Sequence, residues 1–542
     1  MQSQASIEAN PITILPHLSR LFVDFLAQGR GSSALLYEFY PMRKATSEQM
    51  SVSAAKVAGR AAMAERLLAQ NRSFGAGEAA LQNIERLRRG ASVVVTGQQV
   101  GLFGGPLLVL YKAATAVVQA QAMGAVPVFW LASEDHDLDE VDHAVVGSRR
   151  RLETLRLALS GRGRPVGGLQ LGEGVTPLLA EVARLLGDST ELDWLREAYR
   201  PEATLAEAFG CWMARIFGEW GLVVIDASTR EWHQAGAATL RQAIERAEEL
   251  ERLLTERNRL LVEQGYHAQV VVSPASSLLF LLEEQTGYRL PLRRHAEGGA
   301  AAWQAGKRSY TTADLLAILD AEPERLSPNA LLRPVFEDTI LPTAAYVGGP
   351  AEVAYFAQAQ VVYQALLGRT TPVLPRMSAT LIPASIAEVM ERHGLSLEDL
   401  FQSSEDALLH RIAARAMPIE GKRKLAQAGR ALDHELAELL PWIESLNPDL
   451  GRAAKTSASK MLYQMNRLRR LAARFEIQKE QSLTRHMHAM AIALRPQGHP
   501  QERVVAGVSY LAAYGQSIIE CALAAANRAR SEAAPEHYAI HL

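Results

Sequence analysis

Residues 92–106 read SVVVTGQQVGLFGGP, and residues 126–140 read VPVFWLASEDHDLDE. Each stretch begins with a short apolar run of the kind found in strands buried within a parallel sheet, and each continues into a polar loop. Between them, Pro106 suits the first position of a helix, and residues 107–123 are good helix formers with Lys112 as their one charge. The order strand, glycine-rich loop, helix, strand and acidic loop predicts a βαβ unit.

The two loops of this unit are the predicted active site. A right-handed crossover makes the strands parallel, so both loops leave the sheet at its carboxyl edge, where ligands of open α/β sheets bind. The predicted catalytic residues are Glu134, Asp135, His136 and Asp137. The predicted substrate-binding residues of the first loop are Thr96, Gly97, Gln98, Gln99, Gly101 and Gly105.

The glycine-rich loop matches neither of two known phosphate-binding patterns. No Gly-Lys-Ser/Thr sequence follows it, and its glycine spacing differs from that of the dinucleotide fingerprint. Its glycines still allow backbone amides to approach an anion closely, and Gln98 and Gln99 offer neutral donors and acceptors. We therefore expect the loop to recognise a phosphate or carboxylate group.

The acidic segment has three interpretations, which the sequence leaves open. Adjacent like charges raise one another's pKa, so a carboxylate here could serve as a general base near neutral pH. Alternatively, His136 with Asp135 or Asp137 could hold a divalent metal. In the third interpretation, these residues cap a helix that begins near Leu138.

A later segment repeats the order strand, glycine turn and helix. Residues 343–347 form the expected strand, Gly348-Gly349-Pro350 the turn, and residues 351–367 a helix with Glu352 in its first turn. Two helix N-termini, each with unpaired N–H groups and a positive dipole end, would then point into one crevice; the alternative is two well-made helix starts. This segment adds Arg333, Gly348, Gly349 and Glu352 to the predicted substrate-binding residues.

The composition excludes several classes of function. The 542-residue chain is 48% hydrophobic with a formal net charge of -2, so we expect a large core and neither nucleic acid nor an anionic membrane as partner. The two cysteines suit a reducing compartment. Because the first residues lack a basic and then apolar leader, and no run of about eighteen apolar residues occurs, we expect a cytoplasmic protein.

The remaining pattern predicts further elements. Residues 1–90 read mostly helical, residues 221–227 read as a third buried strand, and residues 241–264 read as one long charged helix. A strand is expected at residues 267–272, and an antiparallel pair at residues 278–282 and 288–292.

From about residue 383 to residue 494 the chain reads as helix alone. Apolar residues follow the alternating three- and four-residue spacing of a coiled-coil seam on both sides of Asn447-Pro448. This predicts an antiparallel helical hairpin, with a kink at Pro441. A hairpin cannot bury all of its apolar surface alone, so we expect it to serve in dimerisation or in docking to a partner.

Motifs along essentially the whole chain together resemble the bacillithiol biosynthesis cysteine-adding enzymes. They are Thr96-Gly97-Gln98-Gln99, Gly105-Pro106, Pro127-Val128-Phe129-Trp130, Glu134-Asp135-His136-Asp137, Ser327-Pro328-Asn329, Arg333-Pro334, Gly348-Gly349-Pro350, Pro375-Arg376-Met377-Ser378 and Gln501-Glu502-Arg503. The resemblance implies an α/β fold, in which a Rossmann-like, nucleotidyltransferase-type core carries two connective insertions and an α-helical antiparallel coiled-coil arm that forms a homodimer. It also implies a ligase that joins L-cysteine to the amine of glucosaminyl-malate through an amide bond, giving bacillithiol.

Seven segments follow from this resemblance. They are residues 1–148 (N-terminal helices and first half of the core), 149–205 (first insertion), 206–285 (second part of the core), 286–330 (second insertion), 331–382 (last part of the core), 383–495 (coiled-coil arm) and 496–542 (a C-terminal segment that packs back on the core).

The resemblance leaves the activation of cysteine open. Related class I ligases carry a His-x-Gly-His signature in the first loop and a Lys-Met-Ser-Lys-Ser loop after the sheet. Here the first loop has Gln98-Gln99 and Gly104-Gly105, and residues 376–380 look like a remnant of the second loop without its lysines. The family expectation of a nucleotide pocket near this remnant makes Arg376 and Ser378 the predicted residues for ATP or ADP. Adenylation of the cysteine carboxylate by ATP remains a hypothesis.

In the scheme that these observations favour, the glycine-rich loop holds the malate carboxylates or an acyl intermediate. Asp135 or Asp137 takes a proton from the attacking amine, and His136 orients the amine or binds the cysteine thiolate through a metal. One alternative is a catalytically degenerate nucleotide-binding scaffold that recruits the true ligase through its coiled coil. Another is metal-dependent hydrolysis at the acidic segment.

Overall fold

The computed structural model describes residues 6–27, 38–40, 59–148, 151–297, 300–416, 419–479, 481–531 and 536–542. The chain divides into two compact units. The first comprises Met1–Thr13, His17–Thr380 and Gln501–Ile540, and the second comprises Ile14–Pro16, Leu381–Pro500 and His541–Leu542. Within the described ranges, no helix is both long enough and apolar enough to cross a lipid bilayer.

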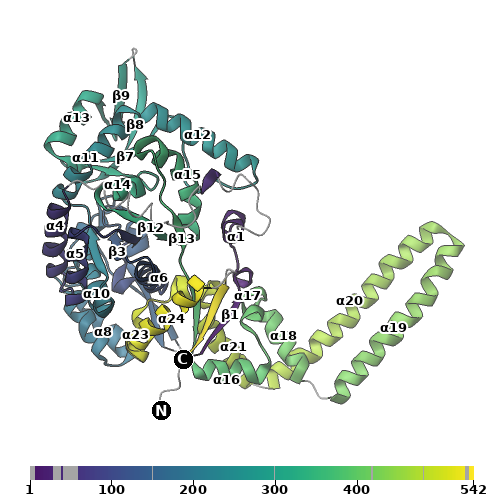
Figure 1. Cartoon of the computed structure of the whole chain (residues 1–542). Helices are drawn as coiled ribbons and strands as arrows, with labels where there is room; N and C mark the ends of the chain where they lie inside the picture. The colour runs from purple at the N-terminus through teal and green to yellow at the C-terminus, as the bar shows by residue number, and fades with distance from the viewer. Residues whose placement is uncertain are drawn as a thin grey trace. The chain divides into compact units, whose positions relative to one another are not determined.

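The first unit is built on a five-stranded parallel sheet (Figure 1). Its strands, in spatial order, are β13 (Val373–Pro375), β12 (Thr343–Gly348), β2 (Val93–Gln98), β3 (Val126–Leu131) and β6 (Val223–Asp226). Each neighbouring pair is parallel. Of the five strands, β2 comes first in the sequence and lies at the centre of the sheet. The next two, β3 and β6, extend the sheet on one side of β2, and β12 and β13 then extend it on the other side. This is the strand order of a Rossmann-like sheet, and it confirms the predicted βαβ unit and third strand.

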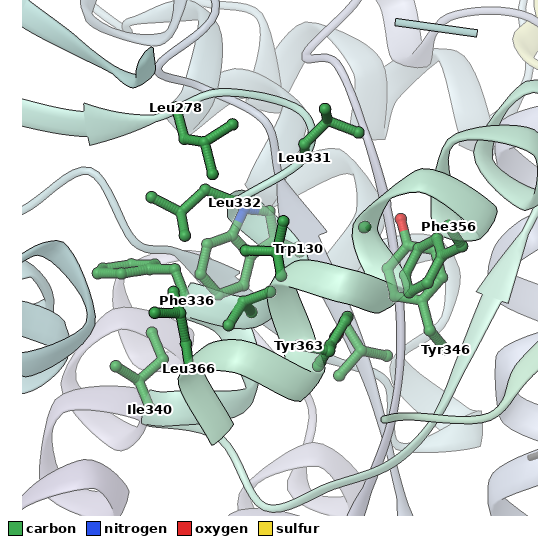
Figure 2. Packing of buried hydrophobic residues seen from close by; sticks show 14 of the residues in the cluster. Trp130, Leu278, Leu331, Leu332, Phe336, Ile340, Tyr346, Phe356, Tyr363 and Leu366 are labelled. Atoms are coloured by element: carbon green, nitrogen blue, oxygen red, sulfur yellow. The ribbon is translucent and has the colours of Figure 1, made fainter. Parts of the chain in front are cut away.

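Helices cover both faces of this sheet, which explains the near-continuous apolar strands. Val94 packs with Ala116 and Ala120 of α6 (Leu108–Ala122) in a small cluster. Its neighbours Val93 and Val95 point to the opposite face and join the main core. In that core, Trp130 of β3 lies against Phe336 of α14 (Arg333–Ile340), with ring centroids 6.4 Å apart (Figure 2).

The helices predicted after β2 and β12 are confirmed. They are α6 and α15 (Pro350–Leu367), each of which begins close to its predicted proline or glycine turn. At the start of α15, Gly349 N–H donates to Glu352 Oε2 at 2.7 Å, so Glu352 caps the helix that carries it.

A second sheet is antiparallel and extends the predicted pair to five strands. In spatial order these are β10 (Arg308–Thr311), β9 (Ala300–Ala305), β8 (Arg289–Glu297), β7 (Ser276–Leu282) and β11 (Leu326–Pro328). The strand predicted at residues 267–272 is wrong. Val270 instead donates to and accepts from the side-chain amide of Gln358, at 2.9 Å in both bonds, so a side chain replaces a strand partner.

Other predictions for this unit need correction. The long helix predicted at residues 241–264 is two helices, α11 (Arg230–Glu245) and α12 (Ala247–Glu263). The predicted helical region at residues 1–90 begins with a strand, β1 (Ser6–Pro11), and continues with α1 (Arg20–Ala27), α4 (Arg60–Ser73) and α5 (Glu78–Arg88). Residues 1–5, 28–37 and 41–58 of that region lie outside the described residues.

The remaining elements of the first unit are α7 (Leu138–Val141), β4 (His143–Ser148), β5 (Arg151–Arg156), α8 (Val175–Leu186), α9 (Thr190–Ala198), α10 (Leu205–Ile216), α13 (Thr312–Ala321), α22 (Gln501–Val504), α23 (Val508–Tyr514) and α24 (Ser517–Ser531). A three-stranded sheet follows the order β1, β15 (Glu536–His541) and β14 (Ser378–Ile382).

The second unit is helical, as predicted. Its helices are α16 (Ala384–His393), α17 (Leu397–Gln402), α18 (Glu405–Ala416), α19 (Ile419–Leu446), α20 (Pro448–Lys479) and α21 (Gln481–Leu494). The two longest, α19 and α20, form a hairpin that turns at Asn447 (Figure 1). The helix α19 continues through Pro441. Many apolar side chains of this hairpin are exposed, among them Trp442 at 59% and Phe475 at 63%.

Candidate active site

The carboxyl ends of β2 and β12 lie side by side at the point where the strand order reverses. Open α/β sheets bind ligands at such a switch point. Thr96 Oγ1 donates to Val347 O at 2.9 Å and joins the two strand ends. The two predicted glycine loops, after Gln98 and after Gly348, are therefore neighbours, as the repeated sequence pattern indicated.

A buried lysine links the two loops. Lys112 of α6 is only 3% exposed, and its Nζ lies 2.5 Å from Glu352 Oε2. The same ammonium donates to Gly97 O at 2.6 Å and to Gln98 Oε1 at 2.9 Å. Burial lowers the pKa of Lys112, although Glu352 opposes the shift. Gln98 and Glu352 thus use their side chains to hold the loops, and Lys112 is a site residue that the sequence showed only as the one charge in its helix.

The later part of the glycine-rich loop is buried. Tyr199 accepts from Gly104 N–H at 2.8 Å and donates to Gly101 O at 3.1 Å. Gly105 O accepts from Gly507 N–H at 3.1 Å. A Cβ on Gly104 would lie 2.2 Å from the Trp212 indole, so close packing requires glycine there. Gly101 and Gly105 are therefore covered by other parts of the protein and do not face solvent.

A small hollow lies over the carboxyl ends of β3 and β6, beside the switch point. Its walls are Trp130, Leu131, Ala132, Glu134, Asp135, Ala227, Ser228, Arg289, Pro328 and Arg333. The hollow thus brings together two predicted catalytic carboxylates, the predicted substrate-binding Arg333, and Arg289, which the sequence analysis missed. Charges of both signs face a single small space.

Asp135 is held by hydrogen bonds and by cations. Its Oδ2 accepts from Gln99 Nε2 at 2.9 Å, and its Oδ1 accepts from His136 N–H at 2.7 Å. Burial raises the pKa of Asp135, but the guanidinium groups of Arg333 and Arg289 and the His136 hydrogen bond outweigh burial and hold this pKa below its ordinary value. The expectation that like charges would raise the pKa is wrong for Asp135, because cations surround it.

The other residues of the acidic segment have separate environments. Asp137 caps α7, with its Oδ1 accepting from Asp139 N–H at 3.2 Å, so the capping interpretation holds for this residue. The carboxyl group with a raised pKa is Glu140, through burial and the charges of Asp137 and Asp135. Among the residues that the structure describes, no group of three or more histidine, cysteine, aspartate or glutamate side chains is arranged to hold a metal ion.

Glu134 is paired with a buried histidine. His233 of α11 is fully buried, and its Nε2 lies 2.8 Å from Glu134 Oε1. Burial lowers the pKa of His233, but the nearby Glu134 carboxylate has the larger, opposite effect, so the pKa of His233 lies above its ordinary value. The pair therefore fixes Glu134 at the wall of the hollow. No local sequence signal identified His233, because its partner lies in a distant segment.

Arg289 is anchored on several sides. Its Nε donates to Ser327 Oγ and its Nη2 donates to Pro328 O, both at 2.9 Å. Its guanidinium carbon lies 3.8 Å from the centre of the Phe280 ring, and its Nη1 contacts His136 Nδ1 at 3.3 Å. Arg289 is 8% exposed, so this cation is rigid and largely desolvated at the edge of the hollow.

Arg333 has a different environment. Its guanidinium makes no hydrogen bond and no ion pair within 4 Å to any described residue, yet it lines the hollow. One helical turn later, burial raises the pKa of Glu337 to about 8, although Arg333 opposes the shift. Burial opposes the charge of Arg333, but Tyr355, Glu337, Tyr346 and Asp135 outweigh burial and hold the pKa of Arg333 above its ordinary value. An anionic ligand in the hollow would add a direct contact to this longer-range stabilisation.

The predicted nucleotide-binding residues belong to a buried network at another place. Arg376 lies 2.6 Å from Glu502 through Nη2, and Ser378 Oγ donates to the same carboxylate at 3.0 Å. Ser378 Oγ also lies 2.8 Å from His537 Nδ1. These contacts join the segment after Gln501 to the core. Nucleotide binding by Arg376 and Ser378 stays a prediction.

Comparisons with known proteins cover the whole chain. Residues 7–377 match the family model described as "Bacillithiol biosynthesis BshC, N-terminal Rossmann-like domain", and residues 379–540 match "Bacillithiol biosynthesis BshC, C-terminal coiled-coil domain". A Koribacter versatilis protein named "Putative cysteine ligase BshC" is 41% identical over 542 residues, with 98% of this chain and 99% of the relative covered. Proteins of the same name from Solibacter usitatus and Salinibacter ruber are 35% and 30% identical, covering 92% and 96% of this chain and 94% and 96% of the respective relatives. The chain therefore belongs to the BshC family of bacillithiol biosynthesis.

Proposed function

We propose that this protein is a cysteine ligase that joins the carboxyl group of L-cysteine to the amine of glucosaminyl-malate. Its relatives are named as cysteine ligases, and its family is named for bacillithiol biosynthesis. The observation that carries the proposal is Arg333, whose guanidinium lines a hollow beside the switch point and makes no hydrogen bond or ion pair within 4 Å to another residue that the structure describes. Both substrates are carboxylates, so either would supply such a direct contact.

In this proposal Asp135 acts by charge and position. Its pKa is low, so it is a weak base but a permanent anion that attracts the ammonium group of a substrate. Gln99 and His136 fix its two oxygens. The amine that attacks must lose a proton, and a carboxylate with a lowered pKa such as Asp135 is poorly suited to accept it.

An amide bond does not form from a free carboxylate in water without activation. We therefore propose that ATP activates the cysteine carboxylate before the amine attacks. Purified protein should then consume ATP only when both L-cysteine and glucosaminyl-malate are present, or should exchange pyrophosphate into ATP with L-cysteine alone. ATP consumption that is independent of L-cysteine would contradict the proposed activation.

The test of function is a thiol profile of cells that lack the gene, measured by mass spectrometry. Glucosaminyl-malate should accumulate in these cells, and the intact protein should restore bacillithiol. The Arg333→Met variant should fail to restore it. The matched control is Arg162→Met, because the Arg162 side chain is 73% exposed and, among the residues that the structure describes, forms its ion pair with Asp139 alone. An unchanged thiol pool in the deletion strain would refute the function.

A second candidate is a scaffold that binds a nucleotide and recruits the true ligase through α19 and α20. One observation favours it: the hairpin exposes many large apolar side chains. Amide formation by the purified protein separates the two functions. A scaffold would produce no bacillithiol without a further protein, whereas a ligase would.

A further inference from the structure

We propose that Glu502 is a positioning residue of the candidate active site, and that it acts through Arg376 on the second glycine loop (residues 348–350). The segment that begins with Glu502 also holds the first glycine loop (residues 97–106). The inference rests on the proposed function, because both loops contain predicted substrate-binding residues. It gives a role to the motif Gln501-Glu502-Arg503, which lies far from both loops in the sequence.

Arg376 connects the second glycine loop to Glu502. The backbone N–H of Arg376 donates to Gly348 O at 2.9 Å. A Cβ on Gly349 would lie 3.4 Å from Arg376 Nε, so the guanidinium lies directly against this glycine. From there, Nη1 and Nη2 donate to Glu502 Oε2 and Oε1 at 3.1 Å and 2.6 Å. Two parallel bonds fix the orientation of a guanidinium as well as its distance.

The carboxylate of Glu502 is itself held in place. Its Oε2 accepts from Ser378 Oγ at 3.0 Å and from Ala379 N–H at 3.2 Å. The side chains of Arg376 and Glu502 are 4% and 3% exposed, so solvent screens their attraction little. Burial opposes both charges, but the attraction outweighs it: the pKa of Arg376 lies above its ordinary value, and the pKa of Glu502 lies below. The ionised pair therefore keeps the guanidinium at one place.

The same segment, residues 502–507, contacts the first glycine loop. Leu107 N–H donates to Val505 O at 2.9 Å, and Gly507 N–H donates to Gly105 O at 3.1 Å. The amide of Leu107 lies at the N-terminus of α6, where backbone N–H groups have no partner within the helix. One short segment thus joins the end of the first loop and, through the ion pair, the second loop.

Loss of the Glu502 charge should disturb the loops, because a desolvated guanidinium without its carboxylate is strongly disfavoured. Arg376 would keep its bond from Nη1 to Met377 O at 2.8 Å but lose its paired anion. The next carboxylate that acts on Arg376 is Glu352, which already pairs with Lys112. Competition for Glu352 would weaken the contact that links the two loops.

Cells that lack the gene provide the first test. Glu502→Gln keeps the size of the side chain but removes its charge, and at equal protein level it should restore about tenfold to hundredfold less bacillithiol than the intact protein, as expected for slightly misplaced reacting groups. The matched control is Asp338→Asn, which removes the charge from another buried arginine pair. Asp338 contacts Arg369 and Thr371, neither of which belongs to a glycine loop. The control should restore bacillithiol fully.

Hydrogen–deuterium exchange of the purified full-length variants gives a readout that does not depend on activity. In Glu502→Gln, peptides that contain residues 348–352 should exchange roughly tenfold faster, the factor expected for loss of one charge-assisted hydrogen bond. In Asp338→Asn, the same peptides should exchange as in the intact protein. Unchanged exchange of residues 348–352 in Glu502→Gln would overturn the inference.

A double variant separates positioning from folding. Arg376→Met with Glu502→Gln removes both buried charges, so its thermal midpoint should recover relative to Glu502→Gln alone. Exchange of residues 348–352 should stay fast, because the side chain that holds the second loop is missing. If slow exchange returns together with the thermal midpoint, the pair serves folding alone and the inference is wrong.

The two proposals fail in different ways. If the intact protein and Glu502→Gln restore bacillithiol equally at equal protein level, the ligase stands and the positioning role falls. If the deletion strain has an unchanged thiol pool but Glu502→Gln and its control show the expected exchange, the ligase falls and the positioning of the loops stands.

Discussion

Replacing Lys112 with methionine should destabilise the first unit by about 3–5 kcal/mol, the usual cost of removing one partner of a buried ion pair. Methionine matches the lysine stem in length but leaves Glu352 without the ammonium 2.5 Å away, and leaves Gly97 O and Gln98 Oε1 without their donor. Glu352 keeps its bonds from Gly349 N–H and Tyr346 Oη, which limits the loss. Because Lys112 holds both loops of the switch point, ligase activity should fall with stability.

Urea denaturation followed by tryptophan fluorescence measures this effect, because six of the seven tryptophans lie in the first unit. The informative comparison is a double-mutant cycle of Lys112→Met and Glu352→Gln. Each single variant leaves one buried charge without its partner, whereas the double variant removes both charges. The loss in free energy of unfolding of the double variant should therefore be smaller than the sum of the losses of the two single variants. A cost below about 1 kcal/mol for Lys112→Met, or strict additivity in the cycle, would refute the reasoning.

Three further predictions concern buried charge and assembly. His233 has a folded pKa above its unfolded value of about 6.5, so the stability that its pair with Glu134 contributes is complete below that pH and is lost as pH rises through the folded pKa. The difference between the urea midpoints of the wild type and of His233→Gln should therefore shrink above about pH 6.5. A difference that stays constant with pH would argue against the pair. Glu337, with a folded pKa of about 8, binds its proton more tightly in the folded state, so stability should fall as pH rises from about 4.5 to 8, and Glu337→Gln should flatten that fall in the same assay. The proposed homodimer should appear in sedimentation velocity, and the double substitution Trp442→Glu and Leu446→Glu on the exposed hairpin should yield monomers with an unchanged circular dichroism spectrum.

The central sheet could be predicted because its signal is local. The apolar runs that became β2, β3, β6 and β12 each lie within a few consecutive residues, and burial on both faces requires that composition wherever the strand occurs. The run at residues 267–272 has the same composition but became irregular backbone. Its hydrogen-bond partner is the Gln358 side chain, 88 residues away, which no local pattern can reveal.

The site was predicted only where its residues are neighbours in the sequence. Asp135 and the two glycine loops were found because the topology of a βαβ unit determines where such loops lie. Arg289 contacts His136 across 153 residues of sequence, from a strand of the second sheet, and His233 reaches Glu134 from a helix that follows the third strand. The missed residues are therefore those that the insertions and later elements bring to the sheet edge.

This difference changes the chemistry that the acidic segment supports. Considered alone, Glu134, Asp135 and Asp137 repel one another, and this repulsion raises the pKa of a carboxyl group, so that its carboxylate becomes a stronger base. In the fold, His233 pairs with the first, two guanidinium groups lie near the second, and a helix start uses the third. The segment consequently presents Asp135 as an ionised carboxylate beside Arg289 and Arg333, so this carboxylate acts through its fixed charge and is a poor proton acceptor.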